Sequence, residues 1–392
     1  KELAKFGYKQ DLNRSMRRFS SFAVSFSLIS ILTGIFANFH FGYSEVGNFI
    51  PISWSVVFIG QLIVALIMAE LSINYPISGY GYQWTYRLVG PKLGFMTGWL
   101  LLLQFLTGFP GICKALSILI GDLIRQNFGV DLNSLLISVL VIWTVTLIHL
   151  KGINLVSKIN NIGVITELIG VLVLIISLGY FFFKKSDYDL SLSINYIDIT
   201  DLTFKSFALS ILLGAWCLTG FEAAADMSEE TKNPKFTVPK SIMYSFLSSG
   251  ILGLIIIVLT TLFLSANNYV KINNNYLTDM LQSEFGKPIY LLTLFFVIIA
   301  IFACAVACMA TASRLIFSMS RDSILPKSKW LSIVDNNKSP FNSLIFIGVI
   351  STIFIVIFQK IEMITSVSAI SGYIGYCGII YSSFFLKRNG ST

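Results

Sequence analysis

The stretch Leu32-Thr33-Gly34-Ile35-Phe36 lies inside the first hydrophobic segment of this chain, and its Leu-Thr-Gly motif recurs as Leu218-Thr219-Gly220 inside the sixth. Glycine weakens a helix and permits backbone angles that other residues avoid. Within a bilayer, backbone groups freed by a break are tolerated only where protein or a wet cavity surrounds them. Matching broken segments in two halves of one chain are typical of the central binding site of a transporter. The motif therefore predicts a pair of broken helices.

Composition indicates a membrane protein. Hydrophobic residues make up 55% of the 392 residues, charged residues make up 12%, and the mean hydropathy is +0.77. Soluble domains carry about 25% charged residues. Ten runs approach or exceed the roughly 20 apolar residues that a helix needs to cross a bilayer. They are predicted near residues 19–39, 52–74, 93–119, 134–150, 159–183, 206–227, 239–266, 289–319, 341–359 and 362–386. The chain is thus predicted to be an all-α polytopic membrane protein.

Basic residues predict the orientation. The tail 1–18 is rich in Lys and Arg, and placing it in the cytoplasm puts most of the 28 Lys and Arg residues on that side, as the positive-inside rule requires. The segment 387–392 is then also cytoplasmic and resembles a loop cut short before two further spans. The net charge of +8 needs no nucleic acid, and we expect the basic tail to contact anionic lipid. The predicted location is the plasma membrane, or the inner membrane in a bacterium.

The spans divide into two halves of five, 19–183 and 206–386, joined by the polar stretch 184–205 on the outside. Because five is odd, the second half begins on the opposite side of the membrane from the first. The two halves are therefore predicted to be an inverted repeat. The Leu-Thr-Gly motif falls in the first span of each half, at equivalent positions.

Signatures of enzymes and cofactors do not accompany this pattern. All five cysteines lie in hydrophobic segments, where small apolar packing residues are expected rather than metal ligands. The chain contains no Gly-rich phosphate loop, no HExxH motif and no Gly-x-Ser-x-Gly elbow. Neither a cofactor nor a metal is predicted, and the chain is not expected to be an enzyme.

A broken helix provides groups that bind a zwitterion. The second half-helix presents unpaired N–H groups, which attract a carboxylate, and unwound carbonyl groups can bind an ammonium group. Close helix packing at glycine is the alternative, and it would be preferred for a single motif, whereas a repeated motif favours a binding site. Gln104 is more often a contact between helices than a ligand. The predicted substrate-binding residues are Ile31, Leu32, Thr33, Gly34, Ile35, Thr219, Gly220, Phe221, Glu222 and Gln104.

Ionisable residues inside spans are costly and usually have a partner or a function. Glu167 lies well inside the fifth span, where desolvation favours the protonated form needed in a proton carrier; a neutral packing acid is the alternative. Glu222 is equally suited to contacting a substrate amine and to capping the unwound turn. Asp226 is predicted to be a solvated gate charge. Lys114 and Arg314 are expected to extend to the outer and the cytoplasmic interface.

Further motifs surround the two breaks. They are FGYKQDLNRS at 6–15, FSLISILTGIF at 26–36, AEL at 69–71, YPISGYGYQW at 75–84, TGFEAAADMSEET at 219–231, VPKSI at 238–242, and the shorter Ser313-Arg314, Ser320-Arg321-Asp322 and Leu325-Pro326. In combination they resemble the amino acid permeases of the amino acid–polyamine–organocation superfamily, and more specifically its amino acid/choline branch. The resemblance covers nearly the whole chain. It implies a LeuT-like 5+5 inverted repeat with broken helices 1 and 6, usually carried on twelve spans.

The chain departs from the family pattern at three positions. Tyr80 stands where many relatives have a small residue, and Asp226 stands where many members of the branch have His. Glu167 lies at about the position of a Lys in certain proton-coupled relatives, so the role of that Lys is not carried over. Thr311 and Ser313 lie where sodium-coupled members of the fold supply hydroxyl ligands, which makes them candidates for ion coupling.

These observations predict a secondary active transporter that works by alternating access on an amino acid or a related amine, as an ion-coupled carrier or an exchanger. Thr33-Gly34 would bind the carboxylate, Thr219-Gly220-Phe221 with Glu222 the amine, and Glu167 is hypothesised to link binding to proton movement; sodium is the other candidate ion. One alternative is a choline- or polyamine-type cation transporter, in which Glu222 and aromatic faces dominate. Another is a non-transporting nutrient sensor on the same fold. A channel is disfavoured because no repeated segment resembles a filter.

Overall fold

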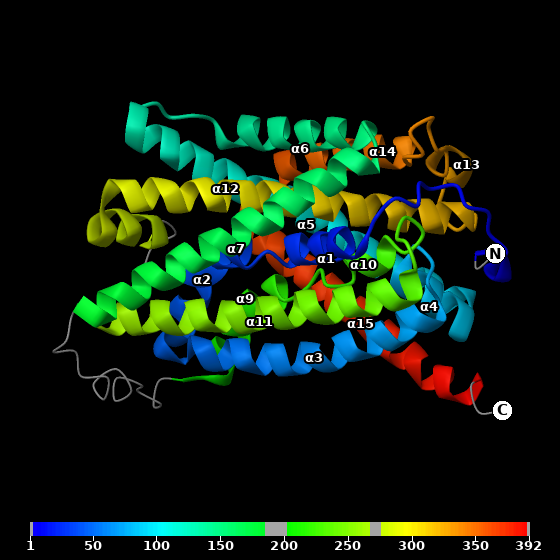
Figure 1. Cartoon of the computed structure of the whole chain (residues 1–392), viewed down its shortest axis with the longest axis horizontal. Coiled ribbons are helices and arrows are strands. Elements are labelled where there is room, and N and C mark those ends of the chain that lie inside the picture. The colour runs from blue at the N-terminus through cyan, green and yellow to red at the C-terminus, as the bar shows by residue number, and fades with distance from the viewer. Residues whose placement is uncertain (1–2, 185–201, 267–275, 390–392) are drawn as a thin grey trace.

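The computed structural model describes residues 3–184, 202–266 and 276–389, and within these residues the regular structure is helical (Figure 1). The first half comprises η1 (Leu3–Phe6), α1 (Arg18–Ile29), α2 (Ile31–Val46), η2 (Gly47–Phe49), α3 (Ile50–Asn74), α4 (Tyr80–Leu88), α5 (Pro91–Phe128), α6 (Ser134–Leu150) and α7 (Ile153–Lys184). The second half comprises α9 (Phe204–Cys217), α10 (Ala223–Asp226), α11 (Pro234–Ala266), α12 (Tyr276–Arg321), α13 (Ser328–Leu331), α14 (Phe341–Ile357) and α15 (Ile361–Asn389).

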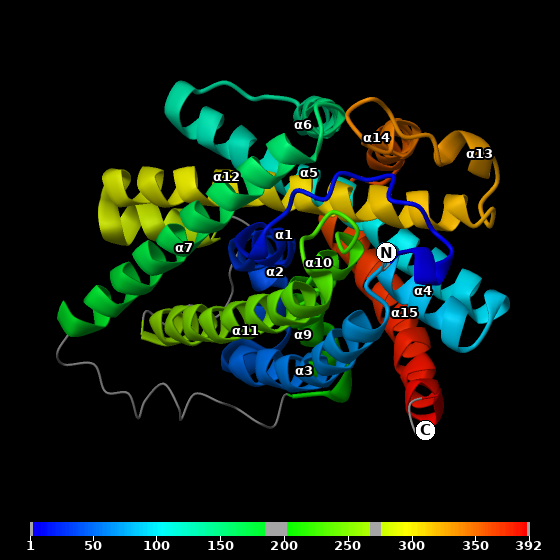
Figure 2. The same ribbon diagram turned by 45° about the vertical axis from the view of Figure 1, so that its right-hand side comes forward.

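The helices follow the predicted spans. Six described stretches are long and apolar enough to cross a membrane, and α6, α9 and α14 are shorter apolar helices. Each predicted span overlaps one helix, except that the first is split into α1 and α2 and the sixth into α9 and α10. The predicted connector 184–205 lies mostly outside the described residues, and so does the end of the predicted segment 387–392. Both η1 and the end of α15 lie at the same end of the bundle (Figures 1 and 2).

Apolar side chains cover both the inside and the outside of the bundle. On α3, for example, Ile59, Ile63 and Leu66 are exposed at helical spacing, as expected of a face in contact with lipid. The opposite face of α3 packs on α11, where an added Cβ at Gly253 would lie 2.4 Å from the Trp54 ring. Small residues at such contacts let the two backbones approach closely. Packing of this kind, rather than polarity, decides which face of a helix is inside.

The first break lies at Ser30, three residues before the predicted Thr33-Gly34. Ser30 has φ 36° and ψ 90°, and its side chain accepts a hydrogen bond from the backbone N–H of Thr33 at the start of α2. Serine often caps a helix in this way because its hydroxyl satisfies an otherwise unpaired N–H. Gly34 is helical, and a Cβ there would lie 2.3 Å from the Sγ of Cys217. In the first motif, glycine therefore permits close packing of α2 on α9, the role expected of a single Thr-Gly.

We expect Gly34→Ala to destabilise the protein by about 1–3 kcal/mol, the usual cost of overpacking. The added Cβ meets both the Sγ of Cys217, at 2.3 Å, and its Cβ, at 2.6 Å. Adding Cys217→Gly should recover part of the loss. Thermal unfolding of the detergent-solubilised protein measures both effects. Gly60→Ala is the control, since a Cβ there meets no atom within 4 Å; equal loss at both positions would contradict the packing role.

The second break lies at the predicted motif. The helix α9 ends at Cys217, α10 begins at Ala223, and Gly220 between them has φ 106°. Only glycine adopts this angle without strain. A Cβ on Gly220 would lie 2.7 Å from the Cγ of Leu28 and 3.1 Å from the backbone N of Ile29. The second break therefore packs directly on the end of α1, and the two breaks meet in the middle of the bundle.

Candidate functional site

A small cavity, with a volume of about 30 Å³, lies where the two breaks meet. That volume holds about two water molecules, so a larger occupant requires the surrounding helices to move apart. No charged side chain is among the described residues that line the cavity. The lining consists of Leu28, Ile29 and Thr33 from the first broken helix, Trp216, Thr219 and Gly220 from the second, Gln104, Phe105, Gly108 and Ile112 from α5, Cys304 and Cys308 from α12, and Ser368 from α15.

The structure brings part of the predicted binding set to this cavity. Lining residues are Thr33, Gln104, Thr219 and Gly220. The remaining members of the set are buried away from the described lining; they are Ile31, Leu32, Gly34, Ile35, Phe221 and Glu222.

Phe105 and Trp216 are the aromatic residues among the described lining of the cavity, and the predicted binding residue Phe221 is not among them. The ring of Phe221 packs edge-on against Phe246, with ring centroids 5.3 Å apart, and its carbonyl accepts a hydrogen bond from Ser25 at 2.8 Å. Both Phe221 and Trp216 flank the unwound residues, and nothing in the sequence distinguishes which one turns toward the cavity.

Glu222 caps the unwound turn, which is one of the two roles considered from the sequence. Its Oε2 accepts a hydrogen bond from the backbone N–H of Gly220 at 2.9 Å, and its Oε1 accepts one from the hydroxyl of Tyr376 at 2.7 Å. Gln104 lies beside both side chains. Of these three residues, Gln104 lines the cavity. Sequence reasoning missed Tyr376, because 154 residues separate it from Glu222.

Glu167 lies against the first break. Its Oε1 accepts a hydrogen bond from the hydroxyl of Ser30 at 3.0 Å and one from the backbone N–H of Leu32 at 3.3 Å. Its Oε2 is buried without a hydrogen-bond partner among the described residues. The carboxyl group thus occupies the N-terminal end of α2, where a helix attracts negative charge.

The hydroxyl groups of Thr311 and Ser313 donate to carbonyl groups of their own helix, those of Ala307 at 3.1 Å and Ala310 at 2.9 Å. Neither side chain lines the cavity. Cys304 and Cys308, which precede them on α12, do. Sequence reasoning predicted these cysteines to be packing residues only; their spacing of four on one helix face was the available signal. The described residues contain no group of His, Cys, Asp or Glu that could hold a metal ion.

Charged side chains near the end of the bundle that carries the N-terminal residues are buried with hydrogen-bond partners inside the protein. Asp226 is fully buried, and its Oδ1 accepts a hydrogen bond from the backbone N–H of Gly79 at 2.6 Å. Arg314 donates two hydrogen bonds of 2.9 Å to Glu230. The predictions of a solvated Asp226 and of an Arg314 that extends to the interface are therefore wrong, because each side chain has a partner inside the protein. Lys114 is buried too, and its ammonium group donates a hydrogen bond to the hydroxyl of Ser134 at 2.7 Å.

Comparisons with known proteins agree with this architecture. The chain matches the family described as amino acid permease over residues 17–390. It is 28% identical to amino-acid permease BAT1 of Arabidopsis thaliana, over 99% of this chain and 81% of the relative. It is 22% identical to the low-affinity putrescine importer PlaP of Escherichia coli, over 77% of this chain and 66% of the relative.

Among solved structures, the chain resembles MhsT in complex with L-phenylalanine. The TM-score is 0.69 at 13% sequence identity, and the match covers 94% of this chain and 89% of that chain. The fold is the LeuT-like fold with two broken helices, so the predicted fold class is confirmed. Together, the family match over nearly the whole chain and the shared fold identify this chain as a member of the amino acid permease family, a membrane transporter and not an enzyme.

Proposed function

We propose that the chain is a secondary active transporter that carries a neutral amino acid across the membrane by alternating access. The observation that carries this proposal is the uncharged cavity at the meeting point of two broken helices. A zwitterion has no net charge, and its two charged groups need partners at separate places. The N-terminal end of α2 can accept the carboxylate, and unwound carbonyl groups at the second break can accept the amine.

A polyamine fits this site less well than an amino acid. PlaP is by its name a putrescine importer, and a diamine needs carboxylate or aromatic partners at both ends. Among the described residues around the cavity, the nearest carboxyl group to the second break belongs to Glu222. Both of its oxygens are already engaged, by Gly220 and Tyr376. A cation would have to compete with these two hydrogen bonds, whereas the amine of a zwitterion can use backbone carbonyl groups.

We propose a proton as the coupling ion, with Glu167 as its carrier. The carboxyl group of Glu167 already occupies the N-terminal end of α2, through Ser30 and Leu32. An ionised Glu167 would repel a substrate carboxylate arriving at the same N–H groups, whereas a neutral Glu167 would not. Proton and substrate should therefore bind together. Sodium has less support, because Thr311 and Ser313 bond to their own helix and do not reach the cavity.

Uptake into proteoliposomes tests the proposed function. We expect labelled alanine or leucine to accumulate under an inward proton gradient, and putrescine and choline to be taken up much more slowly. Dependence on a sodium gradient would contradict proton coupling, and preferential uptake of putrescine would contradict the proposed substrate. Binding without uptake of any of these compounds would favour the sensor. We also propose a cytoplasmic N-terminus in a plasma or inner membrane, from the excess of Lys and Arg on that side.

A further inference from the structure

A second pocket, with a volume of about 290 Å³, lies at the end of the bundle that carries the N-terminal residues, apart from the cavity between the two breaks. Three segments that are distant in the sequence form it: the chain before α1, the junction of α6 with α7, and the loop between α13 and α14. The described lining consists of Asn13, Lys151, Gly152, Ile153, Asn154, Asn336, Asn337 and Lys338. It thus holds two lysines, four asparagines and no acidic side chain. Such a lining suits an anion whose oxygen atoms accept hydrogen bonds.

The two lysines of the pocket have no counter-charge within the described part of the chain. Lys151 and Lys338 are exposed, and neither forms an ion pair with a described carboxylate. The acid nearest to Lys338 in the sequence, Asp335, accepts a hydrogen bond from the backbone N–H of Ser339 at 2.8 Å and is engaged in its own turn. Two like charges at one pocket repel each other, and an anion bound there offsets this repulsion.

Backbone groups at the start of α7 add to the positive charge of the pocket. The helix begins at Ile153, and the first N–H groups of a helix have no partner within it and attract anions. Gly152 has φ 98°, and a Cβ there would lie 3.6 Å from the Cβ of Asn337. The side chain of Asn337 donates to the carbonyl of Leu150 at 3.2 Å. The junction of α6 with α7 and the loop between α13 and α14 are therefore in direct contact.

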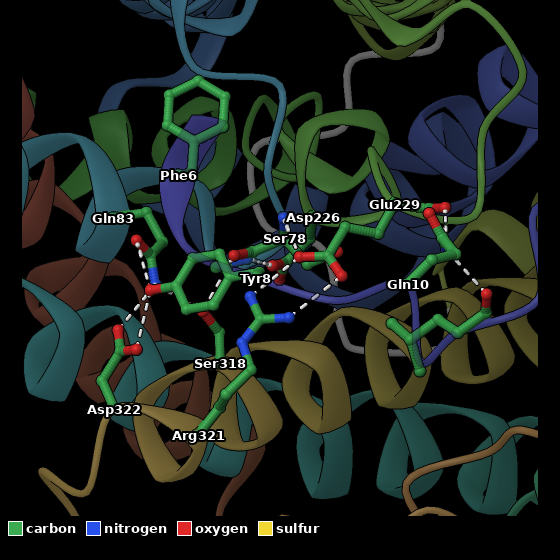
Figure 3. Close-up of polar contacts among 12 residues, drawn as sticks. Phe6, Tyr8, Gln10, Ser78, Gln83, Asp226, Glu229, Ser318, Arg321 and Asp322 are labelled. Atoms are coloured by element: carbon green, nitrogen blue, oxygen red, sulfur yellow. Dashed lines mark hydrogen bonds and ion pairs between the residues drawn. The ribbon is translucent and has the colours of Figure 1, made fainter. Parts of the chain in front are cut away.

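The chain that supplies Asn13 is held in place by its own contacts (Figure 3). The side chain of Gln10 donates to the carbonyl of Glu229 at 3.0 Å. The hydroxyl of Tyr8 donates to Oδ1 of Asp322 at 2.7 Å. All three sides of the pocket are thus attached to the rest of the protein before any ligand binds, which lowers the entropy cost of binding.

One face of α7 continues from the pocket along the outside of the bundle. Asn154 lines the pocket, Lys158 is exposed one turn later, and exposed apolar residues then recur at spacings of three or four. These apolar residues are Ile162, Ile165, Ile169, Leu172 and Ile176. Residues at these spacings share one face of a helix. The pocket, a basic residue and an apolar stripe therefore follow one another along α7, in the same order as the headgroup and acyl chains of a phospholipid.

We propose that this pocket binds the headgroup of an anionic phospholipid, with an acyl chain along the apolar stripe of α7. Lys151 and Lys338 pair with the phosphate, the N–H groups at the start of α7 donate to its oxygen atoms, and the asparagines contact the rest of the headgroup. The lipid belongs to the leaflet at this end of the bundle. Apart from Asn13, the site lies outside the basic tail, and the inference depends on neither the substrate nor the coupling ion.

Native mass spectrometry of the detergent-solubilised protein measures binding. The probe is dioleoyl phosphatidylglycerol, and its comparisons are dioleoyl phosphatidylcholine, which has no net charge, dihexanoyl phosphatidylglycerol, which has short chains, and inorganic phosphate. We expect the parent to bind the probe more tightly than each comparison. Phosphatidylcholine tests the charge of the headgroup, the short-chain lipid tests the stripe, and inorganic phosphate distinguishes a lipid site from a site for the free anion.

We expect Lys151→Ala combined with Lys338→Ala to weaken binding of dioleoyl phosphatidylglycerol by about tenfold or more, because each lysine contributes to the attraction of an anionic lipid. Binding of phosphatidylcholine should not change. Lys92→Ala combined with Lys240→Ala is the matched control, since it removes equal charge from two exposed lysines outside the described lining, and it should bind like the parent. Ile162→Ser, in the stripe, should reduce the preference for the long-chain over the short-chain lipid.

Parent-like affinity of the variant that lacks Lys151 and Lys338 would overturn the proposal, and so would an equal loss in the control. Binding of inorganic phosphate as tight as that of the probe would overturn it in favour of a site for the free anion. If the double variant does not fold, Lys338→Ala alone decides, and an affinity equal to that of the parent overturns the proposal. Each readout is binding without transport, so failure of uptake would contradict the proposed function and leave this test unaffected.

Discussion

Glu167→Gln is expected to abolish amino acid accumulation driven by a proton gradient while exchange of internal for external substrate continues. Glutamine keeps the size of the side chain, and its amide oxygen can still accept the hydrogen bonds from Ser30 and Leu32. The amide cannot, however, take up or release a proton. The variant should therefore cycle between its two orientations only in a form that resembles the protonated carrier.

The measurement compares uptake of a labelled neutral amino acid into proteoliposomes with and without an imposed pH gradient, and then counterflow with no gradient. In the parent, the gradient should increase accumulation; in Glu167→Gln it should have no effect. Glu70→Gln is the matched control, since Glu70 is an exposed acid near the end of α3. Gradient-driven accumulation at the parent level in Glu167→Gln would refute proton coupling through this residue.

Glu230→Gln is expected to have the largest effect on stability. The Arg314–Glu230 pair has two hydrogen bonds of 2.9 Å, and the two side chains are 1% and 0% exposed. Removing the charge of Glu230 leaves the guanidinium group buried without a counter-charge, which costs about 3–5 kcal/mol. Replacing both partners, as in Arg314→Met with Glu230→Gln, should recover much of this loss, because neither member of the pair is then charged.

Thermal unfolding in detergent measures these changes. Glu229→Gln is the comparison, since its partner Arg321 is 12% exposed and also contacts the Tyr8 ring. The Glu229 variant should lose less stability, because water can solvate the remaining charge in part. A double variant that is as unstable as Glu230→Gln alone would contradict the interpretation that the unpaired charge causes the loss.

Most of the fold was predictable, because the bilayer requires long apolar helices whatever they pack against. The second break was predictable for a similar reason, since Gly220 has a backbone angle that other residues rarely adopt. The first break was placed three residues late. Thr33-Gly34 has the same two residues as Thr219-Gly220, but the helix is not broken there. The break lies at Ser30, which follows α1 and caps α2, and Gly34 packs on Cys217.

The candidate site was predictable only in part. Thr33, Thr219 and Gly220 line the cavity as expected, because they belong to the breaks themselves. Phe221 was expected at the site but does not line the cavity, whereas Trp216, for which the sequence predicted no role, does. Asp226 and Arg314 looked like groups near water, yet both are buried with partners that come from distant parts of the chain.

By itself, the sequence determined the membrane class, the approximate spans, the family and the strained glycine of the second break. Each of these depends on hydropathy, on local backbone preference or on contiguous motifs. The tertiary structure alone decided which side chains face the cavity and which buried charges are paired. Lipid and protein interior are both apolar, so no polar periodicity marks the inner face of a membrane helix. The partners of Glu222, Glu167 and Tyr8 come from other helices, and only packing brings them within hydrogen-bond distance.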